Sequence, residues 1–287
     1  LRLVRKIRPD VVITHADPKL ARLVARCYPQ AEHIFYYHGS ILEAAFDQPT
    51  WEDFSSRVSK LIVICQAAID GLECKFGRLS IPYKIILNGI DTDRIRPAKI
   101  LEKANARGHF GLDEQNIAVI YAGRLAKTKG VWELMAGFID AYDKNKHLRL
   151  VIAGDPARET YGDHSYYAAL QELAAHVPEQ VIQFVGWLSQ PELDLLYQAG
   201  DIAIVASTPE GGEGNSLFLM ESMGYGLACV ATSVGGIPEV LAGTGMLISP
   251  ADIPQGVTQA LDHLSSTRER KRLGAMAAKR AKDHFTY

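Results

Sequence analysis

The sequence lacks several features that would place it in specialised classes of protein. No apolar run approaches the roughly 18 to 20 residues that a membrane-spanning helix needs, and the basic start at residues 1–6 does not fit a signal peptide. The four cysteines form no CxxC pair and no zinc-type spacing with histidine, so we expect neither a zinc site nor a disulfide framework. A reducing, cytoplasmic setting fits this pattern best.

The sequence also has no excess of charge of one sign. It contains 31 Lys and Arg against 33 Asp and Glu, which gives a formal net charge of -2. Without a localised basic patch, such a chain has no positive field that would capture nucleic acid. We therefore expect no nucleic-acid partner.

The composition that is present is that of a folded protein. The chain of 287 residues is 47% hydrophobic and 22% charged, a length that exceeds one ordinary core and suits two compact units. It begins with Leu rather than Met and stops within a helical pattern. We therefore expect a fragment of a longer polypeptide.

Short runs rich in β-branched residues alternate with segments of helical period. The expected strands are residues 11–14, 33–37, 61–64, 84–87, 117–121, 148–152, 181–184, 202–205, 228–231 and 246–248, and the clearest helices are 130–144, 165–176, 190–199 and 216–226. Nearly continuous apolar runs indicate strands covered on both faces, as in a parallel sheet. The pattern predicts an α/β protein.

A turn-rich stretch at residues 88–91 marks the expected domain boundary, which we put near residue 95. The polar residues 99–108 that follow look weakly ordered. The division gives a first domain at 1–95 with only four strands and a larger second domain at 96–287. The small size of the first domain fits a unit whose N-terminal strands are missing.

The first motif with chemical content follows the expected strand at 117–121. There Gly123 and Arg124 lead into a turn, and Lys129 stands before Gly130 at the start of a helix. Ligands bind at the carboxyl ends of strands in open α/β sheets, and a helix N-terminus favours an anion. Arg124 and Lys129 are therefore candidates for gripping a diphosphate, the alternative being that both cations point into water.

The second motif is the Gly-rich loop at residues 209–216 and the helix that it opens. Glu213 lies in the loop and Glu221 lies eight residues later, so one carboxylate stands at the mouth of the site and the other two turns deeper. Ionised carboxylates accept hydrogen bonds from sugar or ribose hydroxyls, and the amides of residues 215–217 suit a phosphate. The alternative makes Glu213 a first-turn carboxylate and Glu221 a solvated helix residue.

These residues resemble the E-x7-E motif of glycosyltransferase family 4. Further segments resemble the donor-domain pattern of that family in its usual order, namely residues 123–130, 152–155, 184–187 and 233–240. The resemblance is close over about 84–287 and looser over 1–83. One departure is Asn215-Ser216, where the family commonly has an aromatic residue and a glycine.

The resemblance implies a fold, a reaction and residue roles. The fold is GT-B-like, with two Rossmann-like parallel-sheet domains facing a cleft, an incomplete acceptor-side domain at 1–95 and a nucleotide-sugar donor domain at 96–287. The reaction is a retaining transfer from a UDP- or GDP-sugar to a glycan or lipid-linked acceptor, in polysaccharide or glycolipid biosynthesis, with no metal and no cofactor beyond the nucleotide sugar. Arg124 and Lys129 neutralise the diphosphate, Glu213 contacts the transferred sugar, and Glu221 contacts the ribose.

The third site ends the expected strand at 33–37, where His38 and Gly39 resemble the histidine strand end of the family's first domain. Such a histidine can donate a hydrogen bond to a sugar hydroxyl or phosphate. His15, at the end of another strand, is the weaker candidate. The full set of expected catalytic residues is His38, Glu213, Arg124 and Lys129, and that of substrate-binding residues is Gly39, Gly123, Gly186, Trp187, Gly214, Asn215, Ser216, Leu217 and Glu221.

Two tempting patterns are set aside. Asp91-Thr92-Asp93 resembles a metal-binding D-x-D, but it follows a turn away from any donor loop, so we interpret it as turn and cap chemistry. The Gly-rich loop at 211–214 lacks G-x-G-x-x-G spacing, which disfavours a nicotinamide enzyme. The alternatives that stay open are a nucleotide-sugar epimerase of GT-B fold and a non-catalytic nucleotide-sugar binding module.

The last segment, residues 266–287, is rich in Lys and Arg. A basic amphipathic helix can rest on anionic lipid, which would bring the protein to the inner face of a membrane. We favour the other reading, in which a solvated helix covers the donor domain through Leu273, Met276 and Ala277.

Overall fold

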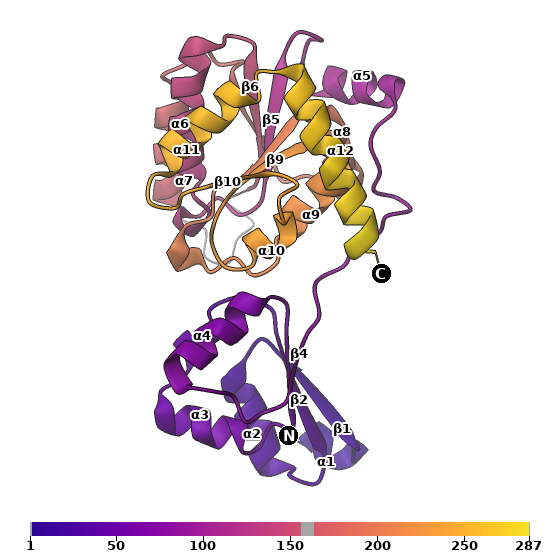
Figure 1. Cartoon of the computed structure of the whole chain (residues 1–287), viewed down its shortest axis with the longest axis vertical. Helices are drawn as coiled ribbons and strands as arrows, with labels where there is room; N and C mark the ends of the chain where they lie inside the picture. Colours follow the sequence, from indigo (N-terminus) through magenta and orange to yellow (C-terminus); the bar gives the residue numbers. More distant parts are fainter. Residues whose placement is uncertain (1, 156–163, 287) are drawn as a thin grey trace. The chain divides into compact units, whose positions relative to one another are not determined.

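The computed structural model describes residues 2–155 and 164–286, with the side chain of His164 left aside. It contains two compact units, Leu1–Asn88 with Gly212–Asn215, and Gly89–Gly211 with Ser216–Tyr287 (Figure 1). Each unit has its own sheet, and every pairing between strands in both sheets is parallel. Among the described residues, no helix combines the length and apolarity that crossing a bilayer requires.

The first unit has a four-stranded sheet in the order β1-β2-β3-β4. Its elements are α1 (Arg2–Ile7), β1 (Val11–His15), α2 (Pro18–Cys27), β2 (Glu32–Tyr37), η1 (Leu42–Ala45), α3 (Gln48–Ser55), β3 (Lys60–Val63), α4 (Gln66–Phe76) and β4 (Tyr83–Ile85). Phe35, Leu42, Phe54 and Leu61 are fully buried at the centre of its core. The four expected strands of this unit are confirmed.

The second unit has a six-stranded sheet in the order β10-β9-β8-β5-β6-β7. Its strands are β5 (Ile117–Ala122), β6 (Leu148–Ala153), β7 (Ile182–Gly186), β8 (Ile202–Val205), β9 (Ala228–Thr232) and β10 (Met246–Ile248). Its helices are α5 (Ile100–His109), η2 (Lys127–Lys129), α6 (Val131–Lys144), α7 (His164–Ala174), α8 (Gln190–Ala199), η4 (Pro209–Gly211), α9 (Leu217–Gly224), α10 (Ile237–Leu241), α11 (Ile253–His263) and α12 (Thr267–His284). The α/β class with parallel sheets is therefore confirmed.

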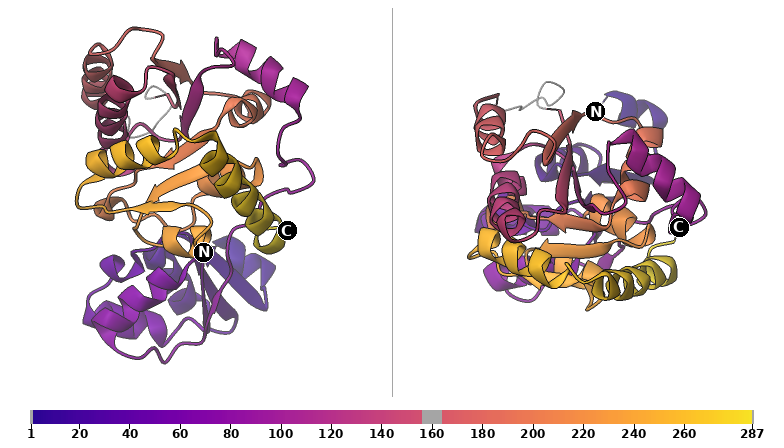
Figure 2. Two further views of the ribbon diagram at one scale, coloured as in Figure 1. Left: turned by 45° about the horizontal axis from the view of Figure 1, so that its top comes forward. Right: turned by 90° about the horizontal axis from the view of Figure 1, so that it is seen from above.

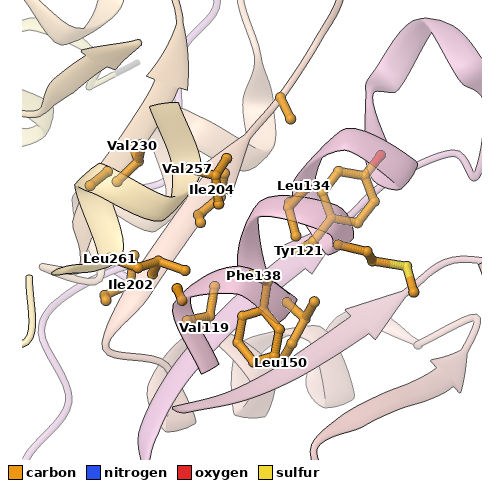
Figure 3. Close-up of a cluster of buried hydrophobic side chains, with 14 of the residues drawn as sticks. Val119, Tyr121, Leu134, Phe138, Leu150, Ile202, Ile204, Val230, Val257 and Leu261 are labelled. Carbon is orange, nitrogen blue, oxygen red and sulfur yellow. The ribbon is translucent and has the colours of Figure 1, made fainter. Parts of the chain in front are cut away.

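Helices cover both faces of the larger sheet (Figure 2). The helices α6, α7 and α11 lie on one face, and α5, α8, α9 and α12 lie on the other. Figure 3 shows the core beneath the first group, where Phe138 and Leu134 of α6 and Leu261 of α11 meet apolar side chains of the strands. This double cover explains the continuous apolar runs, since β8 and β9 are buried at every residue.

The strand order places a topological switch point between β5 and β8. From β5 the chain proceeds outward through β6 to β7, and from β8 it proceeds the other way through β9 to β10. The loops that leave β5 and β8 therefore diverge at the carboxyl edge of the sheet and leave a crevice there. Both motifs identified in the sequence lie in these two loops.

One expectation about order is wrong, because residues 99–108 are not weakly ordered. They form most of α5, where Glu102 accepts a hydrogen bond from the backbone N–H of Lys99 at 2.8 Å and pairs with Arg96. On the same helix Arg107 is buried and reaches Asp201. The helix is stabilised by these partners rather than by an apolar stripe.

The linker between the units also packs more tightly than its turn-rich sequence suggests. Residue 95 lies between the end of the first unit at Asn88 and the start of α5 at Ile100. The second unit already begins at Gly89, because Ile90 and Ile95 are buried beside Gly224.

The basic C-terminal helix α12 covers the second unit, as the favoured reading predicted. Its buried face consists of Leu273, Gly274, Ala277 and Ala281, whereas Met276 is 37% exposed rather than part of that face. A Cβ atom at Gly274 would lie 2.1 Å from the carbonyl oxygen of Gly226, so glycine is what allows the helix to approach this closely.

Candidate functional site

A pocket of about 550 Å³ opens at the carboxyl edge of the larger sheet, beside the topological switch point. Its walls come from the ends of β5 and β6, from the loop after β7, and from α8 and α9. The lining residues are Ala122, Gly123, Arg124, Ala153, Gly154, Asp155, Trp187, Leu188, Gln190, Leu193, Tyr197, Leu217, Phe218 and Glu221. Of the residues expected from the sequence, the pocket brings together Gly123, Arg124, Trp187, Leu217 and Glu221.

The floor of the pocket depends on two glycines that stand side by side. A Cβ atom on Gly154 would lie 2.4 Å from the carbonyl oxygen of Gly123 and 3.0 Å from the side chain of Leu125. Since Cβ atoms do not approach backbone oxygen that closely, a larger residue would push the ends of β5 and β6 apart. Glycine at 154 therefore keeps the floor intact.

Arg124 stands at the carboxyl end of β5 with an exposed side chain, and its carbonyl oxygen accepts a hydrogen bond from the Tyr121 hydroxyl at 2.8 Å. Lys129 closes η2 directly before α6 and is half-buried. Gly130 lies between Lys129 and the start of α6 and has φ +63°. A Cβ atom at Gly130 would lie 1.9 Å from the carbonyl oxygen of Ala206. The turn that carries the two cations is thus held against the end of β8.

Glu221 brings a carboxylate to the pocket from the second turn of α9. Its Oε2 accepts a hydrogen bond from the hydroxyl of Tyr197 at 2.6 Å. Burial raises the pKa of Glu221 above its ordinary value, although the Tyr197 hydrogen bond and the charge of Arg94 act in the opposite direction. The solvated alternative for Glu221 is therefore wrong, because the carboxylate is half-buried and hydrogen-bonded within the pocket wall.

Trp187 and Leu217 present apolar surface to the pocket, with 53% and 52% of their side chains exposed. Gly186 precedes Trp187 as the last residue of β7, with φ +71° and a carbonyl oxygen that accepts from the N–H of Gly154 at 2.8 Å. An exposed indole at the edge of a pocket that also contains charged groups is suited to stacking on a flat ring.

Ser216 begins α9 as its N-cap, and its hydroxyl accepts a hydrogen bond from the N–H of Leu219 at 3.3 Å. This cap fixes the start of the helix, whose first N–H groups are suited to an anion. Ser216 is buried and is not among the residues that line the pocket.

Three further candidates, Glu213, Gly214 and Asn215, lie in the loop segment that belongs to the first unit. The side-chain amide of Asn215 donates to the carbonyl oxygen of Ile64 at 3.4 Å, and the main-chain carbonyl oxygen of Asn215 accepts from the side-chain amide of Asn88 at 3.2 Å. Gly214 is buried beside Gly39. Asn215, where the sequence departs from the family pattern, thus has a structural role in anchoring this segment.

His38 follows β2 and forms a pair with His15, which ends the neighbouring strand β1. Nε2 of His38 lies 2.9 Å from Nδ1 of His15, and the two rings are stacked with centroids 5.2 Å apart. The His38 side chain is exposed, yet partial desolvation and then the charge of His15 lower its pKa. Because one ring must accept the proton of the other, His15 influences which nitrogen of His38 is protonated.

Several pocket residues could not be identified from the sequence. Gln190 and Leu193 line the pocket and Tyr197 holds Glu221, yet in the sequence each is an ordinary helix residue, and Asp155 belongs to the segment 152–155 noted for its resemblance but was not assigned to the site. For Asp155 the strand end that precedes it was the available signal. For Tyr197 the helical period indicates only burial.

The structure supports the turn interpretation of Asp91. Its Oδ1 accepts hydrogen bonds from the N–H groups of Asp93 at 3.1 Å and Arg94 at 3.2 Å, as a turn residue does. Over residues 2–155 and 164–286, no group of three or more His, Cys, Asp or Glu side chains is arranged to hold a metal ion.

Fold and site together define a two-unit α/β protein whose larger unit has a pocket at a topological switch point, where nucleotide-binding domains of this architecture hold their ligand. The family model described as "Glycosyl transferases group 1" matches residues 116–267, and the model for "Glycosyltransferase Family 4" matches residues 1–94. The chain belongs to the group 1 glycosyltransferase family, and the resemblance noted in the sequence is confirmed.

Named relatives agree with this membership. A D-inositol 3-phosphate glycosyltransferase of Corynebacterium aurimucosum is 31% identical over 185 residues, which are 62% of this chain and 42% of the relative. Spore coat protein SA of Bacillus subtilis is 24% identical over 98% of this chain and 76% of its own length. This chain therefore spans less than half of the first relative and about three quarters of the second.

Among solved structures, Anabaena HepE in complex with UDP aligns with a TM-score of 0.82 at 21% identity, covering 99% of this chain and 77% of HepE. At this level of identity the likeness concerns the fold. It supports the GT-B class that the sequence resemblance implied.

Proposed function

We propose that this chain carries the donor-binding machinery of a retaining glycosyltransferase that uses a UDP- or GDP-sugar. The observation that carries the proposal is the pocket at the switch point, where an arginine at a strand end and a half-buried carboxylate in the second turn of a helix line one cavity. A nucleoside diphosphate presents matching groups, namely a negative diphosphate, two ribose hydroxyls and a flat base.

In the proposed reaction, Arg124 and Lys129 neutralise the charge that develops on the departing diphosphate. Breaking the bond between sugar and phosphate leaves negative charge on that group, and fixed cations stabilise it where it forms. The amides at the start of α9, from Asn215 to Leu217, add hydrogen-bond donors for a phosphate oxygen. With these donors the proposed mechanism needs no metal and no cofactor besides the nucleotide sugar.

On the resemblance to the family, Glu213 and His38 are assigned to contact the transferred sugar. A carboxylate and an imidazole each hydrogen-bond sugar hydroxyls, and both interactions strengthen as positive charge builds on the ring. Retention of the anomeric configuration belongs to the same proposal. Glu221 is assigned to the ribose, which agrees with its place inside the pocket.

The acceptor is proposed to be a glycan or a lipid-linked glycan. Relatives whose names refer to polysaccharide or glycolipid synthesis support this class of acceptor. One of them is a lipopolysaccharide 1,2-N-acetylglucosaminetransferase of Salmonella typhimurium that is 24% identical over 93% of this chain. Such an acceptor would be reached in the cytoplasm at the inner face of a membrane. For the donor, HepE has been solved with UDP-glucose, which makes UDP-sugars the first to test.

The proposal is tested by the melting temperature of the chain with a panel of nucleotides. A ligand that binds only the folded state stabilises it by RT ln(1 + [L]/Kd), so saturating UDP- or GDP-sugars should raise the melting temperature and NAD should not. A response to NAD alone would contradict the donor assignment.

The two carboxylates are then separated by variants that keep shape and remove charge. Glu221→Gln should weaken free UDP or GDP, whereas Glu213→Gln and His38→Ala should leave nucleoside diphosphate binding within about twofold and depress transfer. Calorimetry and product formation in a full-length protein give the two readouts. Loss of UDP and GDP binding in Glu213→Gln, with normal binding in Glu221→Gln, would reverse the assigned roles.

A further inference from the structure

Tyr197 lines the pocket although it is almost fully buried. It lies on α8, its side chain is only 1% exposed, and its hydroxyl reaches Oε2 of Glu221 across 24 residues of sequence at 2.6 Å. A tyrosine hydroxyl is the donor in this pair, since an ionised carboxylate can only accept. Charge-assisted O–H···O bonds of this length are the strong class of hydrogen bond.

The ring of Tyr197 packs against two other aromatic rings, which restrain the position of its hydroxyl. It stacks on Tyr225 with centroids 5.0 Å apart at 12° and on Phe218 with centroids 5.8 Å apart at 27°. Phe218 is itself a pocket residue next to the start of α9. The hydroxyl thus stands at a fixed point from which it holds one oxygen of the carboxylate.

We propose that Tyr197 is a positioning residue for Glu221, which locks the carboxylate in the orientation that accepts the ribose hydroxyls of the donor. This inference rests on the proposed function, because it concerns how the same pocket recognises ribose. With Oε2 bound to Tyr197, the rotation of the carboxylate about its last bond is stopped. The remaining acceptor positions then face the ligand at no further ordering cost on binding.

The charges around Glu221 make this hydroxyl important. Burial raises the pKa of Glu221 above its ordinary value and so works against the acceptor form. Tyr197 is the first of the groups that lower that pKa, followed by Arg94, while Asp194 raises it. Arg94 is paired with Asp194, so its charge is partly used elsewhere.

Three other side chains complete the surroundings of Glu221. The pocket also contains Arg124 and Asp155. Tyr225 stacks on Tyr197 and directs its hydroxyl to Asp194 rather than to Glu221. The direct hydrogen-bond donor to the Glu221 carboxylate, among the described side-chain pairs, is Tyr197.

The test compares UDP with 2′,3′-dideoxy-UDP, which lacks both ribose hydroxyls, by calorimetry on the whole chain, with GDP and dideoxy-GDP in parallel. Hydrogen bonds to a charged group are worth about 1.5 to 3 kcal/mol, so the unmodified chain should prefer UDP by roughly tenfold or more. In Tyr197→Phe the preference should fall below about threefold, while affinity for the dideoxy compound changes by less than about twofold. Retained dideoxy binding also shows that the variant is folded.

Tyr225→Phe is the matched control, because it removes the same hydroxyl from the adjacent stacked ring. It should keep the full preference for UDP. Glu221→Gln should lose the preference as Tyr197→Phe does. A second readout is pH: affinity for UDP should fall as Glu221 gains a proton, and in Tyr197→Phe the fall should begin at higher pH, since a group that lowers the Glu221 pKa is gone.

The outcomes separate a failure of the positioning role of Tyr197 from a failure of the proposed donor-binding function. If the unmodified chain binds neither UDP nor GDP, the proposed function fails. If Glu221→Gln loses the preference for UDP and Tyr197→Phe keeps it, the function stands and the positioning role is wrong. Equal loss of UDP and dideoxy-UDP in Tyr197→Phe, or equal loss of preference in Tyr225→Phe, would also overturn the inference.

Discussion

Two cations pair with one largely buried carboxylate, that of Asp201, directly before β8, and they should differ sharply in their effect on stability. Asp201 accepts from Lys103 at 2.6 Å, from Arg107 at 3.0 Å and from the N–H of Ala118 at 2.9 Å. The Arg107 side chain is 8% exposed and that of Lys103 is 36% exposed. The perturbation is replacement of each cation by methionine, which keeps an unbranched stem.

The magnitude follows from burial and from what each cation leaves behind. Arg107 also donates to the carbonyl oxygens of Ala199, Asp113 and Asn116, at 3.3, 2.6 and 2.7 Å. Removing one partner of a buried ion pair costs about 3 to 5 kcal/mol, whereas an exposed pair contributes about 0 to 1 kcal/mol. For a domain of roughly 150 to 250 residues, 1 kcal/mol shifts the melting temperature by about 2 to 4 °C.

Arg107→Met should therefore lower the melting temperature of the larger unit by roughly 6 to 20 °C, and Lys103→Met by less than about 4 °C. Scanning calorimetry at pH 7 measures both. Equal shifts for the two variants would refute the reasoning that burial, and not the shorter distance, decides the contribution.

The same cluster has a defined pH dependence. Burial raises the pKa of Asp201, but Lys103, the Ala118 N–H and Arg107 together hold it below its ordinary value. A carboxyl group with a lowered pKa in the fold contributes stability at neutral pH and loses it as the pH falls through that pKa, so the contribution should disappear below about pH 4.

Four further substitutions test the pocket. Arg124→Ala and Lys129→Ala should each weaken UDP or GDP about tenfold or more and uridine or guanosine far less, which calorimetry measures; equal losses would place these cations away from the phosphates. Gly154→Ala should lower stability by about 1 to 3 kcal/mol and weaken nucleotide binding, because its Cβ meets the Gly123 carbonyl oxygen at 2.4 Å; an unchanged melting curve and unchanged affinity would contradict this. Because the pKa of Glu221 is raised in the fold, its ionised form opposes folding at pH 7, so Glu221→Gln should raise the melting temperature of the ligand-free chain while weakening UDP; a lower melting temperature would contradict that sign.

The fold class and the strands could be predicted from the local pattern of apolar residues. Each of the ten expected strands corresponds to a strand of the structure, because a strand buried on both faces requires an uninterrupted apolar run that is visible within a few residues. The two motif loops could be predicted for a similar reason. Glycine followed by Arg124 at a strand end, and glycine-rich sequence before α9, are short-range signals of a turn at the ligand edge.

The helix α5 could not be predicted from local sequence in this way. Its sequence is polar, and its stability depends on Arg107 and Lys103 meeting Asp201, more than 90 residues further along the chain. No window of local sequence contains both partners. Only the packed structure, which brings the start of β8 beside this helix, makes residues 100–109 a stable helix.

The candidate site also has features that could be predicted from the sequence and features that only the tertiary structure shows. The sequence by itself determined which residue types stand at the ends of β5 and β8, since the chain direction and the turns are encoded locally. Tertiary structure alone decided that Tyr197, an ordinary buried position by helical period, directs its hydroxyl at Glu221, and that the glycines at 123 and 154 meet to form the pocket floor. The physical reason is that hydrogen bonds and close contacts depend on distances of a few ångströms between elements, which no periodicity along one element contains.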